Sequence, residues 1–263
     1  MKTKKKSKIR KLLTLLAIIV FITGLVLVLF PPISNTVGKI EAEKIAEDFD
    51  RRVEIINTNR RIKKAEKQNA EKHYVYDESD TGIDYYKVDI GKLYADSKKY
   101  NGKIRNKQES LLISDSAFTK PALHLSQYGI YDGIYGYVDI PKIDLKIPMY
   151  LGTQNDHMSC GAAHLTLTSL PIGDENSNSV LAGHTGYIGR IFFDNIRSLN
   201  QGDTVRVKNY WATLNFKVTE TKVVAPSESQ DIYIEDGRKK LVLVTCISNG
   251  YGGFNRFLVI CEQ

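Results

Sequence analysis

Three side chains that could do chemistry together stand at the ends of short strand-like segments. Cys246 follows the Val-rich segment 241–245, and Arg256 comes directly before the apolar segment 257–261. A glycine-rich loop joins these segments, so we expect the thiol and the guanidinium at neighbouring strand ends. His184 is the first polar residue after another short apolar segment. This set predicts a nucleophile, an oxyanion partner and a general acid and base.

The chemistry that these residue types support is acyl transfer through a thioester. The Cys246 thiolate would attack a peptide carbonyl. His184 would protonate the leaving amine and later accept a proton from the incoming one. Arg256 carries a planar, permanently charged fork of donors, which suits a developing oxyanion and the substrate backbone.

Each of these residues also has a purely structural interpretation. A lone cysteine is most often a buried core side chain, which is what we expect of Cys261. An arginine at a strand end can form a surface salt bridge. Four other histidines compete with His184 for the acid and base role. The main competitor is His164, in the segment G-A-A-H-L-T, and the others are His73, His124 and His157.

Cys160 lies in the segment M-S-C-G, which shows no core periodicity. We expect a small, half-buried residue. The alternative is a reversible disulfide with Cys246, which requires Cα atoms within about 7 Å of each other. Three cysteines are too few for a disulfide framework, and no C-x-x-C pair supports a zinc site.

The segment around Cys246 reads V-L-V-T-C. It resembles the T-L-x-T-C signature of the sortases, cysteine transpeptidases of Gram-positive cell surfaces, with Val242 in place of the first threonine. The G-H pair at His184 and the N-R pair at Arg256 complete the resemblance, which is close over residues 133–263. Within the family the chain is most similar to class C, the pilus-assembling sortases, through the segments 135–143, 147–150 and 168–173.

The resemblance implies His184, Cys246 and Arg256 as catalytic residues and Thr245 as a substrate-binding residue. It implies cleavage of an L-P-x-T-G-like sorting motif between Thr and Gly, and transfer to a lysine amine of a pilin. Alternatives are attachment of surface proteins to peptidoglycan, and a non-catalytic membrane-tethered scaffold that binds pilins. No cofactor is implied. Ten positions separate Cys246 from Arg256, as in class B, whereas class C is commonly one shorter, so the subclass stays open.

Charge is concentrated at the N-terminus. Residues 1–11 hold seven basic side chains and no acidic one, and removing these seven from the 37 basic residues leaves 30 against 30 acidic residues. The remaining chain is therefore formally neutral, which argues against a nucleic-acid partner.

An uncharged apolar run, residues 12–30, follows the basic cluster. Its length suits a transmembrane helix, and the positive-inside rule places residues 1–11 in the cytoplasm. Since no A-x-A pattern follows the run, we expect an uncleaved signal anchor, with a cleaved leader as the alternative. This predicts a single-pass membrane protein whose catalytic domain is extracellular.

The remaining chain divides into a juxtamembrane helical region, 31–132, and a catalytic β-barrel, 133–263. We expect helices over 35–72 and around 94–100, and a loop over 73–86. Short strands then predict a mainly β fold, an eight-stranded sortase-like barrel with short helices. The expected strands are 135–140, 147–151, 179–182, 204–207, 213–224 broken in two, 241–245 and 257–261. We expect a helix or loop over 155–166 and a helix over 189–199.

The barrel is preceded by a segment that resembles the class C lid, a loop whose Asp-Pro-Phe or Asp-Pro-Trp motif covers the active site. This chain has D-S-A-F at 115–118, which lacks the proline and is one residue longer. A proline would fix φ and stiffen the loop. We therefore expect that residues 108–122 form a degenerate lid.

Our first prediction is that Cys246 is accessible in the resting protein. Ordering the flexible pair at 116–117 costs about 1 kcal/mol per residue, which disfavours a locked plug. The measurement is the rate at which a bulky thiol reagent labels Cys246, compared with Asp115→Ala and Phe118→Ala. Unchanged rates are expected, and a sharp acceleration in both variants would show a working lid.

Overall fold

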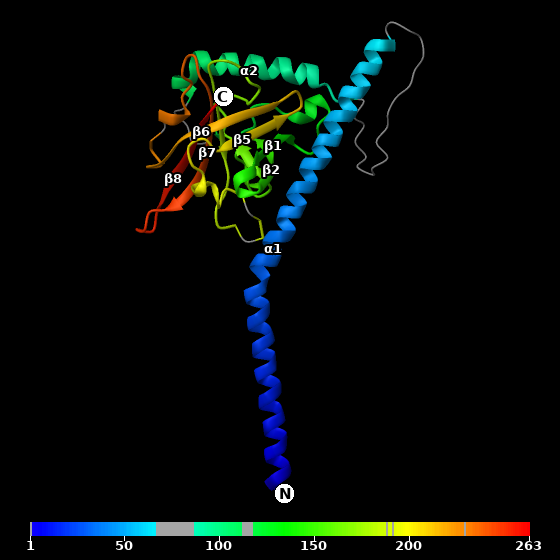
Figure 1. Ribbon diagram of the computed structural model, residues 1–263, viewed down its shortest axis with the longest axis vertical. Helices are drawn as coiled ribbons and strands as arrows, with labels where there is room; N and C mark the ends of the chain where they lie inside the picture. Colours follow the sequence, from blue (N-terminus) through cyan, green and yellow to red (C-terminus); the bar gives the residue numbers. More distant parts are fainter. Residues whose placement is uncertain (1, 67–86, 112–117, 188, 191, 229) are drawn as a thin grey trace.

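The computed structural model describes residues 2–66, 87–111 and 118–263, apart from residues 188, 191 and 229. Figure 1 shows one β-barrel with a long helix, α1 (Lys2–Glu66), along its side and a second helix, α2 (Ile90–Leu111), across one end. The lower half of α1 extends away from the barrel.

The barrel confirms the predicted eight-stranded fold. The closed order of neighbours is β1-β2-β3-β4-β7-β8-β6-β5. The β2–β3 and β4–β7 pairs are parallel, and the other pairs are antiparallel. The strands are β1 (Ile134–Ile140), β2 (Leu145–Leu151), β3 (Ala162–His164), β4 (Ser177–Ala182), β5 (Thr204–Asn209), β6 (Thr213–Val224), β7 (Lys239–Ser248) and β8 (Phe254–Glu262).

The number of strands is as predicted, but two of them differ. The segment 213–224 is one strand, β6, with an irregular register between Val218 and Glu220 instead of a break. The eighth strand is β3, which follows the short helix α3 (Asn155–Met158) in the region expected to be a helix or loop. A strand as short as β3 shows no alternation in sequence, so only its pairing with β2 and β4 reveals it.

The predicted helix over 189–199 is wrong. Within its described residues only a 3-10 turn, η5 (Ile196–Ser198), forms. Asp194 explains the difference, because its carboxylate accepts hydrogen bonds from the backbone amides of Gly186 and Phe192, at 2.6 and 3.0 Å. An aspartate that binds nearby amides competes with helical hydrogen bonding.

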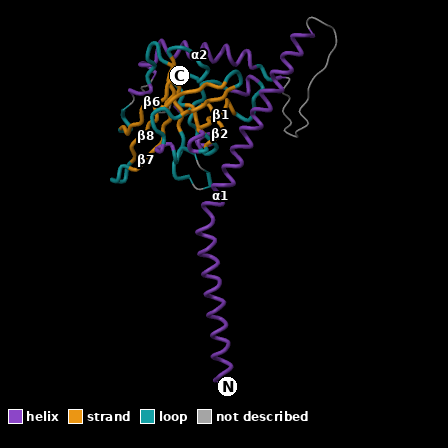
Figure 2. Tube along the Cα trace, viewed as in Figure 1, coloured by secondary structure: helices purple, strands orange, loops and turns teal. Residues whose placement is uncertain are grey.

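The helix α1 joins two predicted elements into one. It contains the apolar run 12–30, whose side chains are exposed, and the expected helix over 35–72 as far as Glu66. Residues 67–72 and the expected loop over 73–86 lie outside the described residues. By length and composition the apolar part could cross a membrane. Pro31 and Pro32 lie within the helix, where proline kinks the backbone without ending it here, and Figure 2 shows α1 changing direction below the barrel.

The upper half of α1 is packed firmly onto the barrel. Phe49 is fully buried, and its ring lies 5.9 Å from that of Tyr137 and 4.8 Å from that of Tyr210. One turn further, Arg52 is buried and pairs with Asp132, which precedes β1. Aromatic packing and a buried ion pair therefore fix the helix to the β1 side of the barrel.

The expected helix around 94–100 is confirmed and is longer, because α2 runs from Ile90 to Leu111. The side chain of its Asn101 forms two hydrogen bonds with the backbone of Leu170. It donates to the Leu170 carbonyl at 3.0 Å and accepts from the Leu170 amide at 2.7 Å. Of the degenerate lid, residues 112–117 lie outside the described residues, and the lid prediction stays a prediction.

Our second prediction concerns Phe49→Ala. Removing a fully buried ring should lower the free energy of unfolding by about 3–5 kcal/mol, because the cavity between Tyr137 and Tyr210 cannot collapse completely. The measurement is denaturant unfolding of the detergent-solubilised chain. Glu54→Ala, at an exposed position of the same helix, is the control and should change stability little. Equal stability of the two variants would contradict the packing described here.

Candidate active site

Cys246 and Arg256 face each other across two antiparallel strands. They are register partners in the β7–β8 ladder, and Nη1 of Arg256 donates to the Sγ of Cys246 at 2.7 Å. The expected strand end at Cys246 is wrong, since β7 continues to Ser248. The sequence did not show this extension because Ser248 resembles a loop residue, but the ladder pairs it with Phe254.

A tight connection sets this register. The side-chain oxygen of Asn249 accepts hydrogen bonds from the amides of Tyr251 and Gly253, at 2.9 and 3.0 Å. The Asn249 amide in turn donates to the Gly253 carbonyl at 3.0 Å. An asparagine that ties its own loop in this way fixes the loop length and therefore the strand pairing.

His184 reaches the same level from the other side of β7. Strand β4 runs parallel to β7 and pairs Ala182 with Val244, and the Gly183 amide continues the ladder to the Val244 carbonyl at 3.0 Å. Strand β4 ends at Ala182, and the same register continued by two residues would bring His184 level with Cys246. Gly183 has no side chain because a Cβ there would press into the Phe193 ring.

All three residues lie on the outer face of the barrel. Side chains alternate between faces along a strand. The neighbours Leu243 and Val259 belong to the interior core, whereas Val242 and Ile260 form a separate cluster on the outer face. Cys246, Arg256 and His184 share the parity of this outer cluster, and each is half-buried. The site is therefore a row of three half-buried side chains, with Cys246 on β7, Arg256 on β8 and His184 two residues after the end of β4.

The ring of His184 is placed by the segment that follows it. It stacks on Tyr187 with centroids 5.8 Å apart and planes at 14°. The carbonyl of His184 accepts from the Phe193 amide at 2.9 Å. The sequence did not identify Tyr187 or Asp194 as part of the site, although both follow His184 within ten residues, because only the folded segment brings them back to it.

Thr245, expected to bind substrate, is 2% exposed and faces the interior. Its hydroxyl donates to the Gly183 carbonyl at 2.8 Å. That bond ties β7 to the residue before His184. The hydrogen bond gives Thr245 a structural role beside His184, and its expected contact with substrate stays a prediction.

Three residues that could compete with the site residues, His164, Cys261 and Cys160, are packed in or against the core. His164 is fully buried, and its Nε2 lies 3.0 Å from the Ser169 carbonyl, while burial lowers its pKa to about 4. Cys261 is fully buried in the core, as predicted, and burial raises its pKa to about 12. Cys160 is a half-buried free thiol packed against the core, which agrees with the expected small half-buried residue.

The outer face of β4, β7 and β8 forms an apolar strip beside the row of His184, Cys246 and Arg256. Next to that row, Ala182 and Val244 are partly exposed. Further along, Val180 and Val242 are fully buried, and Ile232 and Leu165 pack against their cluster. Ile232 belongs to the β6–β7 connection, residues 225–238, which contains the 3-10 turn η6 (Gln230–Ile232).

Two amide side chains hold this connection in place. The Nδ2 of Asn178 on β4 donates to the carbonyls of Asp231 and Tyr233, at 2.7 and 2.9 Å. Gln108 on α2 donates to the Ile232 carbonyl at 3.0 Å and accepts from the Ile234 amide at 2.8 Å. The sequence offered no signal for Asn178, which lies in the polar run N-S-N directly before the predicted strand 179–182, or for Gln108.

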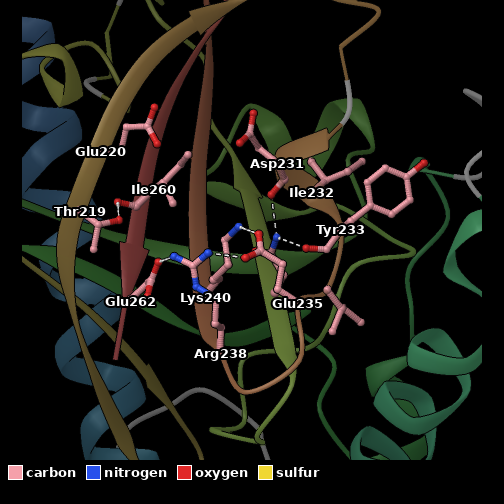
Figure 3. Close-up of polar contacts among 12 residues, drawn as sticks. Thr219, Glu220, Asp231, Ile232, Tyr233, Glu235, Arg238, Lys240, Ile260 and Glu262 are labelled. Carbon is pink, nitrogen blue, oxygen red and sulfur yellow. Dashed lines mark hydrogen bonds and ion pairs between the residues drawn. The ribbon is translucent and has the colours of Figure 1, made fainter.

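A charged cluster closes the strip at the end away from Cys246. Figure 3 shows Glu235 between Lys240 and Arg238, with Arg238 also reaching Glu262. Lys240 is only 4% exposed, and its hydrogen bond is the main reason why the pKa of Glu235 lies below its ordinary value. The strip therefore has apolar side chains in its middle, the row with Cys246 at one end and the charged cluster at the other end.

Comparison with known proteins gives one consistent family. The family model described as "Sortase domain" matches residues 138–263. Sortase D of Bacillus subtilis (strain 168) is 29% identical over 118 residues, which cover 45% of this chain and 57% of that protein. Sortase A of Staphylococcus aureus (strain NCTC 8325 / PS 47) is 28% identical over 116 residues, covering 43% and 55%. The chain thus spans little more than half the length of these curated relatives.

Solved structures match more of their own length. Sortase C of Clostridium perfringens SM101 is 31% identical with a TM-score of 0.52, covering 65% of this chain and 87% of that chain. Sortase C-1 of Streptococcus pneumoniae is 27% identical with a TM-score of 0.58, covering 78% and 97%.

Our third prediction separates the hydrogen-bonding role of Thr245 from simple packing. Thr245→Val keeps the shape but leaves the buried Gly183 carbonyl without its donor, which should cost about 1–3 kcal/mol of stability. Thr245→Ser keeps the hydroxyl and should lose less. Denaturant unfolding measures both, and a Val variant as stable as the Ser variant would contradict the hydrogen-bond assignment.

Proposed function

The chain belongs to the sortase family, and we propose on that basis that it is a membrane-anchored cysteine transpeptidase. In this proposal Cys246 is the nucleophile, His184 the general acid and base, and Arg256 the oxyanion partner. The helix α1 is the anchor, with residues 1–11 in the cytoplasm and the barrel outside the cell.

One observation carries the proposal, the row formed by Cys246 on β7, Arg256 on the adjacent β8 and His184 directly after the adjacent β4. Directly opposite residues of an antiparallel pair have Cβ atoms about 4.5–5.5 Å apart, so the guanidinium of Arg256 reaches Sγ without rearrangement. Cys246 lies in the middle, with the permanent cation on the β8 side and the imidazole on the β4 side. A carbonyl attacked by Sγ would thus meet a charge donor on one side and a proton donor on the other.

The order of events follows from this arrangement. Attack by the Cys246 thiolate forms an S–C bond and moves the carbonyl electron pair onto oxygen, where Arg256 stabilises the negative charge. Collapse of this intermediate breaks the peptide C–N bond, and protonated His184 supplies the proton of the leaving amine. His184, now neutral, then accepts a proton from the incoming amine, which attacks the thioester and releases the thiolate.

The substrate that we propose is an L-P-x-T-G-like sorting motif. Ala182 and Val244, partly exposed beside the catalytic row, offer an apolar floor to its leucine and proline. A sortase C structure of Clostridium perfringens contains the C-terminal cell wall sorting motif, and that protein is 32% identical to this chain. This likeness supports the same class of acyl donor here.

The acceptor that we propose is a lysine amine of a pilin subunit. A pilus-related sortase C of Group B Streptococcus is 26% identical with a TM-score of 0.56, which supports this choice. The second candidate is a cell-wall amine, favoured by the spacing of ten positions between Cys246 and Arg256, which resembles class B. Covalent pilin polymers that disappear in a deletion strain would support the first, and loss of singly attached surface proteins would support the second.

Our fourth prediction tests the chemistry. Incubating the protein with a sorting-motif peptide should give an acyl adduct on Cys246, detected by mass spectrometry, and Cys246→Ala should give none. Arg256→Lys should lower kcat/KM by about 10²–10³, since a point charge cannot replace the fork of donors beside the oxyanion.

Matched variants serve as controls. Cys160→Ala removes another half-buried thiol and should acylate normally, and Arg238→Lys changes an arginine at the far end of the strip. Peptide cleavage by Cys246→Ala, or full activity of Arg256→Lys, would refute the assignment. A folded wild-type chain that binds the peptide without acylation would indicate the non-catalytic scaffold.

A further inference from the structure

We propose that the catalytic end of the barrel lies against the bilayer that α1 crosses, with Tyr251 and Phe254 in the lipid headgroup layer. The inference rests on the proposed membrane anchoring. It adds an interaction surface, the β7–β8 connection, and a partner, the lipid surface itself.

The first support is that α1 meets the barrel directly after the apolar run. Gly38 lies so close to Gly189 that a Cβ on Gly38 would collide with the Gly189 carbonyl oxygen. Asn35 accepts a hydrogen bond from the Gly189 amide at 3.1 Å, and Glu41 pairs with Arg190 at 3.1 Å. The segment that follows His184 is therefore docked on the first turns of α1 beyond the apolar run.

The second support is that no flexible linker separates anchor from barrel. Contacts continue along α1 from Asn35 to the buried Phe49 and the Arg52–Asp132 pair. A helix held at several points along its length fixes the barrel on the part of α1 that continues directly from the apolar run. The bend at Pro31 and Pro32 lies below all of these contacts.

The third support is the distance along the helix. At 1.5 Å per residue, Asn35 and Gly38 lie about 8 and 12 Å beyond Phe30. The headgroup layer of a bilayer extends roughly 5–8 Å beyond the hydrocarbon core on each side. The contact between α1 and the segment after His184 therefore begins at the outer boundary of the headgroups and continues a few Å beyond it. Asp132, level with Arg52, is about 33 Å beyond Phe30.

The fourth support is a group of exposed aromatic side chains at this end. Tyr251 is 96% exposed, Phe254 60% and Tyr187 43%. Figure 1 shows the β7–β8 connection, in red, at the lower edge of the barrel, which is the edge from which α1 extends away. The segment after His184 lies at the same edge. Residues 247–255 carry no charge. Aromatic residues in an uncharged loop are favoured at membrane interfaces.

This orientation has a consequence for the proposed reaction. The row of His184, Cys246 and Arg256 lies between the two membrane-facing segments. A peptide that lies along the apolar strip would therefore meet Cys246 close to the membrane surface.

The experiment places a fluorescent side chain on the predicted contact. The full-length chain is reconstituted in phosphatidylcholine vesicles that contain lipids brominated near the headgroup end of the acyl chain. Tyr251→Trp should show a blue-shifted emission and strong quenching. Tyr131→Trp is the matched control, because Tyr131 is 77% exposed and next to Asp132, far from the apolar run, so its emission should stay unquenched.

The emission of Trp211, the single native tryptophan, is measured in the wild-type chain and subtracted from that of each variant. Flotation of each variant with the vesicles tests anchoring, and acylation of Cys246 by a soluble peptide tests the proposed function separately. Quenching of Tyr251→Trp but not of Tyr131→Trp supports the inference. If the variants float and acylate but the two quench equally, the inference is wrong and the proposed function stands. If the chain does not float, both the anchor and the inference fail.

Discussion

The register between β7 and its two neighbours is the constraint on which the site depends. Antiparallel pairing with β8 sets Arg256 opposite Cys246, and parallel pairing with β4 sets His184 level with them. A slip of one residue would turn Cys246 into the core and Thr245 outward, because side chains alternate between faces. The register is held by interior residues such as Leu243, by the Asn249 turn and by the Thr245 hydroxyl bond.

This register defines an interior and an outer face of the sheet, and each face has a different role. The interior face is filled with apolar side chains and gives the barrel its stability. The outer face is divided along its length, with the reactive row, the accessible pair Ala182 and Val244, and the segment against which Ile232 packs. Asn178 and Gln108 hold the β6–β7 connection, which carries Ile232, by hydrogen bonds. Through Gln108, α2 is therefore connected to the surface on which we propose that the acyl donor binds.

Sequence patterns predicted most of this architecture because it rests on local signals. Apolar alternation located seven strand regions, and the V-L-V-T-C segment, the G-H pair and the N-R pair identified the three residues of the row. The rest depends on contacts that leave no periodic pattern in the sequence. The three-residue β3 exists only through its neighbours, Asp194 removes a helix by binding amides, and the hydroxyl of Thr245 finds its partner on another strand. The full length of β7 was missed for the same reason.

The most direct test is an experimental structure of Cys246 carrying a stable acyl analogue of a sorting peptide. The account predicts that the carbonyl oxygen points to the guanidinium of Arg256 on β8, and that the peptide crosses Val244 and Ala182 on the outer face. A carbonyl oxygen turned toward β4, or a peptide that runs away from this apolar pair, would contradict the account.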